Sequence, residues 1–158
     1  MQTLKTLALA AIAALALTIS ALPAAAQTGD EDAVTAVLAT YRDALTARIL
    51  DGTPELFAPD SQVVEQGKVE GSYADYVEHH IGPELGHITN FVFNDYEVTV
   101  SVEGDIALAT ETYIYRLDLD DGRTIERQGV ATSALRRTES GWRIARYHSS
   151  SRASRPAQ

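Results

Sequence analysis

The apolar residues between Asp30 and Leu50 recur at steps of three and four positions, which is the spacing of one face of an α-helix. We therefore predict a helix over this stretch, ended by Asp51-Gly52. The stripe that would face the core consists of Val34, Val37, Leu38, Tyr41, Leu45 and Ile49.

A second helix is predicted from about Tyr73 to Ile81. Ser72 followed by Asp75 resembles a capping box with a short acid, and Gly82-Pro83 predicts the end of the helix. Helical spacing places His80 on the inward face and His79 on the outward one. The inward face would also carry Tyr73, Tyr76, Val77 and Ile81.

From His87 onward the apolar residues alternate with polar ones, a pattern typical of strands. Glycine-containing turns separate the strands, and a change of phase near Asn94-Asp95 predicts a β-bulge. A short additional strand is expected at Gln62 to Gln66. The four main strands of this antiparallel meander are predicted at Phe91–Val102, Ile106–Leu119, Thr124–Arg137 and Trp142–Ser150.

The turns fix a register if Gly104-Asp105 and Asp121-Gly122 are two-residue loops and the third loop has four residues. The side chains then divide between two faces, and both are largely apolar. We expect the helices to cover one face and a second copy of the chain to cover the other. The face assigned to the second copy includes Val98, Val100, Val102, Ala107, Ala109, Glu111, Tyr113 and Tyr147, and the helix-covered face includes Thr110, Thr112, Ser133, Leu135, Trp142, Ile144, Arg146, His148 and Ser150.

The last strand carries a gradient along one predicted face. Trp142 and Ile144 are apolar, whereas Arg146 and His148 are polar and ionisable. A strand that runs from a core into a cavity would show this gradient, so the sequence predicts that Arg146 and His148 form one wall of a pocket.

The ends of the chain differ from the rest. Lys5, the apolar run Leu7–Leu17 and the small residues before Gln27 are typical of a secretory signal peptide over residues 1–26. We therefore predict a periplasmic or secreted protein that is not held in a membrane after cleavage. One domain is expected over residues 27–150, and residues 151–158 are predicted to be a disordered tail.

Composition excludes several classes of function. The formal charge of −9 argues against binding to nucleic acid or to an anionic membrane. There is no glycine-rich phosphate loop, dinucleotide fingerprint or nucleophile elbow, and we predict no cofactor. His80, Glu84 and His87 have suggestive spacing, but Gly82-Pro83 interrupts the helix that would align them, and no metal site is predicted.

Several short motifs occur in a recognisable order. They are Val69-Glu70-Gly71, Gly104-Asp105-Ile106-Ala107, Asp121-Gly122-Arg123, Thr132, Arg137 and the segment 142–150. In this order they resemble the nuclear-transport-factor-2-like superfamily, and more narrowly its SnoaL-like group, over residues 30–150. The chain is also similar to the association domain of calcium/calmodulin-dependent protein kinase and to ketosteroid isomerases. The resemblance implies an α+β cone, in which a curved antiparallel sheet and N-terminal helices packed on its concave face enclose a pocket and the outer face forms dimers.

The same resemblance implies candidate site residues. Ketosteroid isomerases and scytalone dehydratase use this pocket for proton transfer, and the isomerase pattern of a tyrosine on the first helix and a carboxylate on the next strand falls on Tyr41 and Glu65. The kinase association domain carries pocket arginines, and Thr110 and Ser133 stand at two of their places. Arg146, predicted opposite Ser133, could supply a displaced guanidinium.

Three functions remain open. The first is a binding module for a small, partly apolar, anionic organic molecule. The second is an isomerase or dehydratase with His148 or Glu65 as base and Tyr41 as acid. The third is an oligomerisation module with a vestigial pocket. The predicted ligand-binding residues are Arg146, His148, His80, Tyr76, Thr110, Thr112, Ser133 and Ser150.

Overall fold

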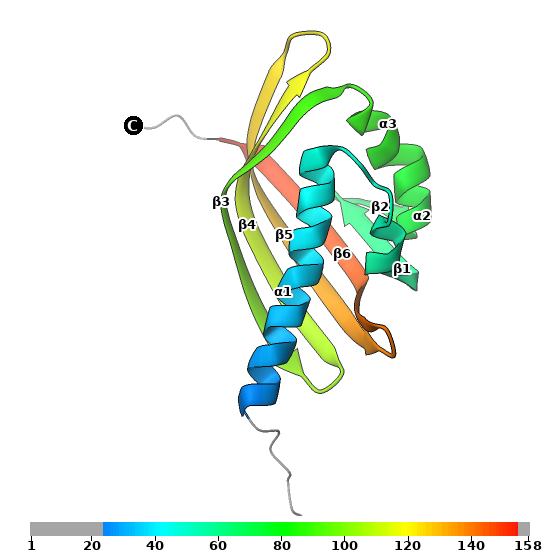
Figure 1. The fold of residues 1–158 in the computed structure, drawn as a ribbon. Coiled ribbons are helices and arrows are strands. Elements are labelled where there is room, and N and C mark those ends of the chain that lie inside the picture. Colours follow the sequence, from blue (N-terminus) through cyan, green and yellow to red (C-terminus); the bar gives the residue numbers. More distant parts are fainter. Residues whose placement is uncertain (1–23, 155–158) are drawn as a thin grey trace, which may run out of the picture.

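The computed structural model describes residues 24–154 and shows a strongly curved, open sheet with one long helix across its concave face (Figure 1). The strand order is β2-β1-β6-β5-β4-β3, and all neighbours are antiparallel except β1 and β6. The predicted α+β cone is confirmed. The elements are α1 (Ala24–Ala47), η1 (Thr53–Leu56), β1 (Phe57–Glu65), β2 (Lys68–Gly71), α2 (Tyr73–Tyr76), η2 (Val77–Ile81), α3 (Gly82–Leu85), β3 (Ile88–Glu103), β4 (Ile106–Leu119), β5 (Thr124–Thr138) and β6 (Gly141–Ala153).

The predicted apolar stripe of α1 packs on the sheet, with Val34, Leu38 and Tyr41 buried. The helix ends at Ala47, three residues earlier than predicted, because Arg48 adopts a left-handed backbone with φ of 58°. Ile49 therefore leaves the stripe and is 57% exposed. Arg48 Nη1 donates to the carbonyl oxygen of Ile88 at 2.7 Å, which ties the end of α1 to the start of β3.

The second helical segment begins as predicted, with Ser72 and Asp75 forming a capping box. The predicted end at Gly82-Pro83 is wrong, because the π-helical turn η2 carries the chain into α3. In this turn the N–H of Gly82 donates to the carbonyl oxygen of Val77, and Pro83 lies in the first turn of α3, where a missing N–H costs little. A Cβ atom at Gly82 would lie 2.3 Å from that carbonyl oxygen, so the turn requires glycine.

The four predicted strands of the meander are all present, and the predicted bulge lies between Asn94 and Glu97. The chain also forms two pairings that were not predicted. β1 is longer than the expected Gln62–Gln66 strand and runs parallel to β6, and β2 pairs with β1 at the edge of the sheet. These additions place the end of β1 beside the middle of β6.

The β4–β5 loop is one residue longer than predicted. Asp118 pairs with Thr124, and the N–H of Leu119 donates to the carbonyl oxygen of Arg123. Residues 120–122 therefore form the loop. Because side chains alternate along a strand, this single residue changes the alignment of β5 with β4. Ser133 and Leu135 lie on the helix-covered side, as predicted, but they share it with Ala109 and Ala107 and not with Thr110 and Leu108.

A second inversion occurs inside β6. Leu135 pairs with Ile144 but Ala134 pairs with Arg146, so Ala145 is an extra residue in a bulge. Trp142 and Ile144 face α1, as predicted, and beyond the bulge Tyr147 and Ser149 face the same side. The prediction that Arg146 and His148 face the pocket is wrong, because the bulge turns both to the exposed outer face.

The predicted cover is correct for Leu135, Trp142 and Ile144, but it is wrong for β3, for β4 and for the part of β6 that follows the bulge. The face that was predicted to pair with a second copy, with Ala107, Ala109 and Tyr113, is the concave face beneath α1. The outer face of the sheet exposes Ile106, Leu108 and Val130.

The end of β6 also corrects the predicted tail. Residues 151–153 belong to β6 and are not disordered. Residues 1–23, which make up most of the predicted signal peptide, and residues 155–158 lie outside the described residues. Within residues 24–154, no helix combines the length and apolar character needed to cross a membrane.

Candidate functional site

A cavity of about 90 Å³ lies between α1, the η2–α3 segment and the concave face of the sheet. It adjoins a wider mouth of about 590 Å³, and Glu65, Tyr115 and Ser151 border both spaces. Most of the inner wall is aromatic or aliphatic, as in many small-molecule pockets. The apolar lining consists of Tyr41, Leu45, Tyr76, Ile81, Ile88, Phe91, Phe93, Tyr113, Tyr115, Leu117 and Tyr147.

The tyrosines of the floor pack against one another and against neighbouring aromatic rings. The ring of Tyr41 lies edge to face with those of Tyr147 and Tyr73, with centroids 5.5 and 5.8 Å apart. Burial raises the pKa of Tyr41, Tyr113 and Tyr147, so these phenols stay protonated at neutral pH. They act as hydrogen-bonding walls and not as bases.

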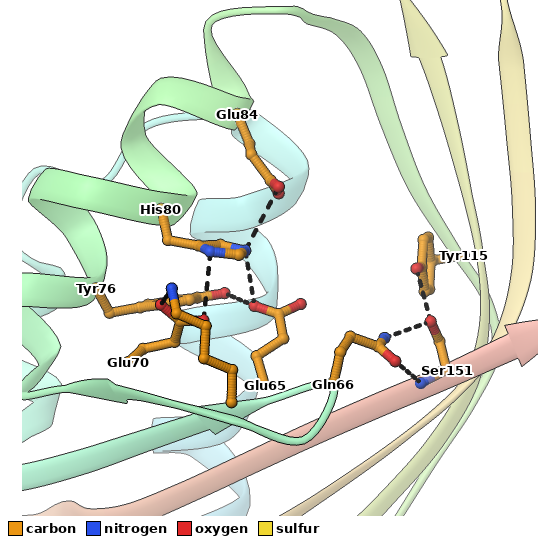
Figure 2. Close-up of polar contacts among 9 residues, drawn as sticks. Glu65, Gln66, Glu70, Tyr76, His80, Glu84, Tyr115 and Ser151 are labelled. Atoms are coloured by element: carbon orange, nitrogen blue, oxygen red, sulfur yellow. Dashed lines mark hydrogen bonds and ion pairs between the residues drawn. The ribbon is translucent and has the colours of Figure 1, made fainter.

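Glu65 is the polar group at the boundary between the cavity and its mouth. Its Oε2 accepts a 2.5 Å hydrogen bond from the Tyr76 hydroxyl, and His80 Nε2 lies 3.4 Å from the same oxygen. Burial raises the pKa of Tyr76, which keeps that hydroxyl a donor. Figure 2 shows the second oxygen of Glu65 directed away from both partners, toward the side of Gln66 and Tyr115.

His80 lies among three carboxylates and stacks on the ring of Tyr76, with ring centroids 5.3 Å apart (Figure 2). Nε2 is 3.4 Å from Glu65 Oε2 and 3.4 Å from Glu84 Oε1, and Nδ1 is 3.5 Å from Glu70 Oε1. Burial raises the pKa of the Glu84 carboxyl. The nearby His80 lowers this pKa, whereas the negative charges of Glu65 and Glu70 raise it further. Small side-chain rotations would therefore join Glu65 to the more exposed Glu84 through the imidazole.

Glu70 supports this cluster from β2. Its side chain is only 4% exposed, and Lys68 Nζ binds Oε2 at 2.8 Å. Oε1 is buried and has no hydrogen-bond partner among residues 24–154. A protonated His80 would have this carboxylate as a counter-charge on its Nδ1 side.

The opposite side of the mouth holds a second polar group, built around the hydroxyl of Ser151. Gln66 Nε2 and Arg127 Nε each donate to Ser151 Oγ at 2.7 Å, and the Tyr115 hydroxyl lies 3.0 Å from it. Arg127 Nη2 also donates to the Ser151 carbonyl oxygen at 2.9 Å. This group fixes the end of β6 against the β1–β2 turn.

A buried carboxyl lies outside this cavity lining, under α1. Glu111 is 5% exposed and accepts a 2.6 Å hydrogen bond from Tyr96, and within the described part of the chain its Oε2 has no hydrogen-bond partner. The guanidinium of Arg42 packs 4.6 Å from the centre of the Tyr96 ring. Burial raises the pKa of Glu111, with Tyr96 and Arg42 opposing the shift.

The structure brings together four of the predicted site residues, Tyr41, Glu65, Tyr76 and His80, whose roles in binding or catalysis stay predictions. Ser150 borders the cavity, and Ser133 is buried beneath α1 outside the cavity lining. The remaining residues, Thr110, Thr112, Arg146 and His148, are exposed on the outer face.

Arg146 and His148 lie beside Thr110 at a shallow hollow of the outer face. The guanidinium of Arg146 donates to the carbonyl oxygens of Asp60 and Ala145 at 3.1 and 2.6 Å. His87, part of the spacing considered for a metal, pairs with Asp120 at 3.0 Å. Across residues 24–154, no group of three or more acidic or histidine side chains is arranged to hold a metal ion.

Sequence reasoning missed Glu70, Gln66, Tyr115 and Ser151. Gln66-Gly67 is a turn signal between two short strands, and it could have placed Glu65 at a strand end with Glu70 on the return strand. Ser151 gave no signal, since it lies in a run of three serines that resembles a frayed end.

Comparisons with known proteins agree with this architecture. The sequence profile of the SnoaL-like domain matches residues 34–154. Among curated proteins no sequence match is found.

Solved structures give three informative likenesses. A candidate dehydratase of the NTF2-like family from Streptomyces avermitilis has a TM-score of 0.70 and 21% identity, over 80% of this chain and 99% of that one. A candidate ketosteroid isomerase from Shewanella frigidimarina has a TM-score of 0.63 and 24% identity, over 77% and 97%. A candidate calcium/calmodulin-dependent protein kinase II association domain from Xanthomonas campestris has a TM-score of 0.60 and 23% identity, over 75% and 85%.

These likenesses share the cone fold, and the profile match extends over most of the chain and over every strand that borders the cavity. The chain belongs to the SnoaL-like family, and it shares its fold with solved structures of the NTF2-like family.

Proposed function

We propose that this protein is a proton-transfer enzyme of the isomerase or dehydratase type, with Glu65 as the base. The observation that carries the proposal is that the two carboxylate oxygens of Glu65 have different surroundings. One oxygen is held by Tyr76 and faces His80, whereas the other is directed away from both (Figure 2). A carboxylate fixed in this way can accept a proton from a bound molecule without reorganising.

The surroundings of Glu65 provide a path for that proton. His80 Nε2 lies between Glu65 and Glu84, and Glu84 lies at the mouth. In an isomerisation, Glu65 takes a proton from one carbon of the ligand and returns it to another, so no co-reactant is needed. In a dehydration, the proton and a hydroxyl group leave as water.

The ligand is expected to be small, mainly apolar and neutral. The anionic ligand predicted from the sequence depended on Arg146 in the pocket, and that guanidinium lies on the outer face bound to carbonyl oxygens. The mouth instead carries Glu65 and Glu84, which would repel an anion, and the guanidinium of Arg127 at the same mouth already donates to Ser151. The aromatic walls favour an apolar body.

Deuterium exchange tests the enzyme proposal. Cyclohexanone, a small neutral ketone, is incubated with the protein in D₂O, and loss of its α-proton NMR signals is followed. A general base contributes roughly a hundredfold or more, so Glu65→Gln is expected to lower the exchange rate at least that much. Glu97→Gln, an exposed change on β3, is the matched control. Equal rates in wild type and Glu65→Gln would refute the proposal, and saturable binding without exchange would favour a binding module.

We also propose export and dimerisation. A signal peptide over residues 1–26 would release a mature chain that begins at Gln27, and N-terminal sequencing of the periplasmic or secreted protein tests this. A homodimer through the outer sheet face would cover Leu108, which is 59% exposed, together with Ile106 and Val130 on the same face.

A further inference from the structure

The outer face of the sheet carries a hollow of about 370 Å³, and α1 covers the opposite face (Figure 1). The shape of the hollow follows from the strand register. Arg146 on β6 pairs with Gln62 on β1 and with Ala134 on β5. On its other side, Ala134 pairs with Leu108 on β4. Because alanine ends at a methyl group, this row of side chains is low in the middle, between the long side chains of Arg146 and Leu108.

The neighbouring row of side chains is polar. His148 pairs with Thr132, and Thr132 pairs with Thr110. All three border the hollow and are exposed. Within residues 24–154, neither the imidazole nor the two hydroxyls have a hydrogen-bond partner. These groups are therefore open to a ligand as donors or acceptors.

The guanidinium of Arg146 is held beside the hollow by one of its nitrogens. Nη1 donates to the carbonyl oxygens of Asp60 and Ala145 at 3.1 and 2.6 Å. Nε and Nη2 have no hydrogen-bond partner in the described part of the chain. Arg42 and Arg116 use these same two nitrogens to bind an aspartate side chain. Arg146 therefore keeps free the edge of the guanidinium that binds a carboxylate.

The charge of Arg146 is not matched by an acidic side chain of its own. The carboxylate of Asp60 is already bound by the guanidinium of Arg136. Hydrogen bonds from Arg136 lower the pKa of Asp60, and the charge of Arg146 lowers it further. Two guanidiniums thus share one carboxylate, and a positive charge remains beside the hollow in a protein whose formal charge is −9. Such a site favours an anion over a neutral molecule of the same shape.

We propose that this hollow binds a small organic carboxylate with an apolar body. The carboxylate oxygens accept hydrogen bonds from Nε and Nη2 of Arg146, and the body of the ligand lies over Ala134 against Leu108. The hydroxyl of Thr132 and the imidazole of His148 are further hydrogen-bonding groups at the same site. The inference goes beyond the proposed function and does not depend on it, because the hollow and the inner cavity lie on opposite faces of the sheet.

Benzoate and its neutral isostere benzamide test the site in an NMR titration of the full chain. The wild type is expected to bind benzoate about tenfold more tightly than benzamide, with amide shifts in β5 and β6, and Arg146→Gln is expected to remove that preference. Ala134→Phe fills the hollow but keeps the guanidinium, and it is expected to weaken benzoate binding. An equal affinity for the two probes in the wild type, or binding of neither, would overturn the inference.

Two other arginines provide matched controls. Arg152 is exposed on the same strand and donates to Gln128, and Arg127 borders the mouth of the inner cavity. Arg152→Gln and Arg127→Gln are both expected to keep the preference for benzoate. Loss of the preference in Arg127→Gln but not in Arg146→Gln would place benzoate in the mouth and overturn the inference. Equal losses in Arg152→Gln and Arg146→Gln would also overturn it, since they would show attraction to positive charge without a site.

The outer hollow and the proposed homodimer share Leu108. Molar mass is therefore measured by light scattering with and without benzoate. A dimer that does not bind benzoate would overturn the inference and indicate that a second copy occupies the hollow. Saturating benzoate is expected to leave α-proton exchange of cyclohexanone unchanged, and inhibition of that exchange would place benzoate in the inner cavity and overturn the inference.

Discussion

The hydroxyl of Tyr76 donates a 2.5 Å hydrogen bond to Glu65 Oε2 and so joins the helical segment beside the cavity to the end of β1. Tyr76 is buried and Glu65 is largely enclosed, which makes this bond a charge-assisted one in a low-dielectric setting. The same contact holds the proposed base in place. Stability and activity should therefore both depend on it.

Replacing Tyr76 by phenylalanine should lower the free energy of unfolding by about 1–3 kcal/mol, because a hydrogen bond to a charged group is lost and the carboxylate keeps its desolvation cost. Urea denaturation measures the change. In the Glu65→Gln background the same substitution should cost less, since the charge is absent. Equal costs in both backgrounds would show that the charge of Glu65 contributes nothing to this contact.

Glu111 should make stability depend on pH. Its pKa is raised in the folded protein, so the folded state holds a proton that the unfolded state has released once the pH exceeds the ordinary carboxyl value of 4.5. The free energy of unfolding should fall as pH rises from about that value to the raised pKa. Glu111→Gln should flatten this part of the curve, whereas the exposed control Glu97→Gln should not. Parallel curves for wild type and Glu111→Gln would contradict the assignment.

Gly129 should be intolerant of a side chain. A Cβ atom there would lie 2.2 Å from Cε2 of the Tyr113 ring, which forms part of the cavity wall. Gly129→Ala is expected to destabilise the fold by about 1–3 kcal/mol through overpacking, as measured by urea denaturation. Gly29→Ala in α1, where no atom of the described residues lies within 4 Å of the added Cβ, is the control. Tyr113→Leu should recover part of the loss, and a Gly129→Ala protein as stable as wild type would contradict the close packing.

Substitutions of residues on the outer face should not affect ligand binding in the cavity. Arg146→Ala and His148→Gln are expected to leave the affinity for cyclohexanone unchanged, because both side chains lie on the far side of the sheet from the cavity. His80→Gln, within the cluster, should slow α-proton exchange. A large loss of affinity in His148→Gln would restore the orientation that the sequence predicted.

The proposed dimer predicts a response to charge at Leu108. Leu108→Arg should convert a dimer to a monomer of unchanged fold, as measured by light scattering after gel filtration, because a guanidinium would be buried without a partner. Thr99→Arg, on the exposed β3 edge, is a control for added charge. A wild type that is monomeric at micromolar concentration would refute the proposal.

The elements could be predicted from sequence because each depends on local chemistry. The stripe of α1, the Ser72 capping box, the Gly104-Asp105 turn and the bulge near Asp95 all follow from short-range patterns. The parallel pairing of β1 with β6 could not be predicted in the same way, since it joins residues about 80 positions apart, such as Val64 and His148.

The site was harder to predict because each error in strand register changes which face every later side chain is assigned to. One extra residue in the 120–122 loop inverts β5 relative to β4, and the bulge at Ala145 inverts the end of β6 relative to its start. Tyr41, Tyr76 and His80 were placed correctly because helical periodicity determines their direction without reference to the sheet.

Ala145 divides β6 into two halves with opposite parity. Before it, even-numbered side chains face α1, and after it, odd-numbered ones do. A saturation mutagenesis profile of residues 142–151 should therefore show tolerance of polar substitutions at alternate positions, with the alternation shifted by one residue at position 145. Deleting that alanine would exchange the inward and outward side chains in the rest of β6. Natural insertions and deletions in this family should therefore avoid the second half of the strand.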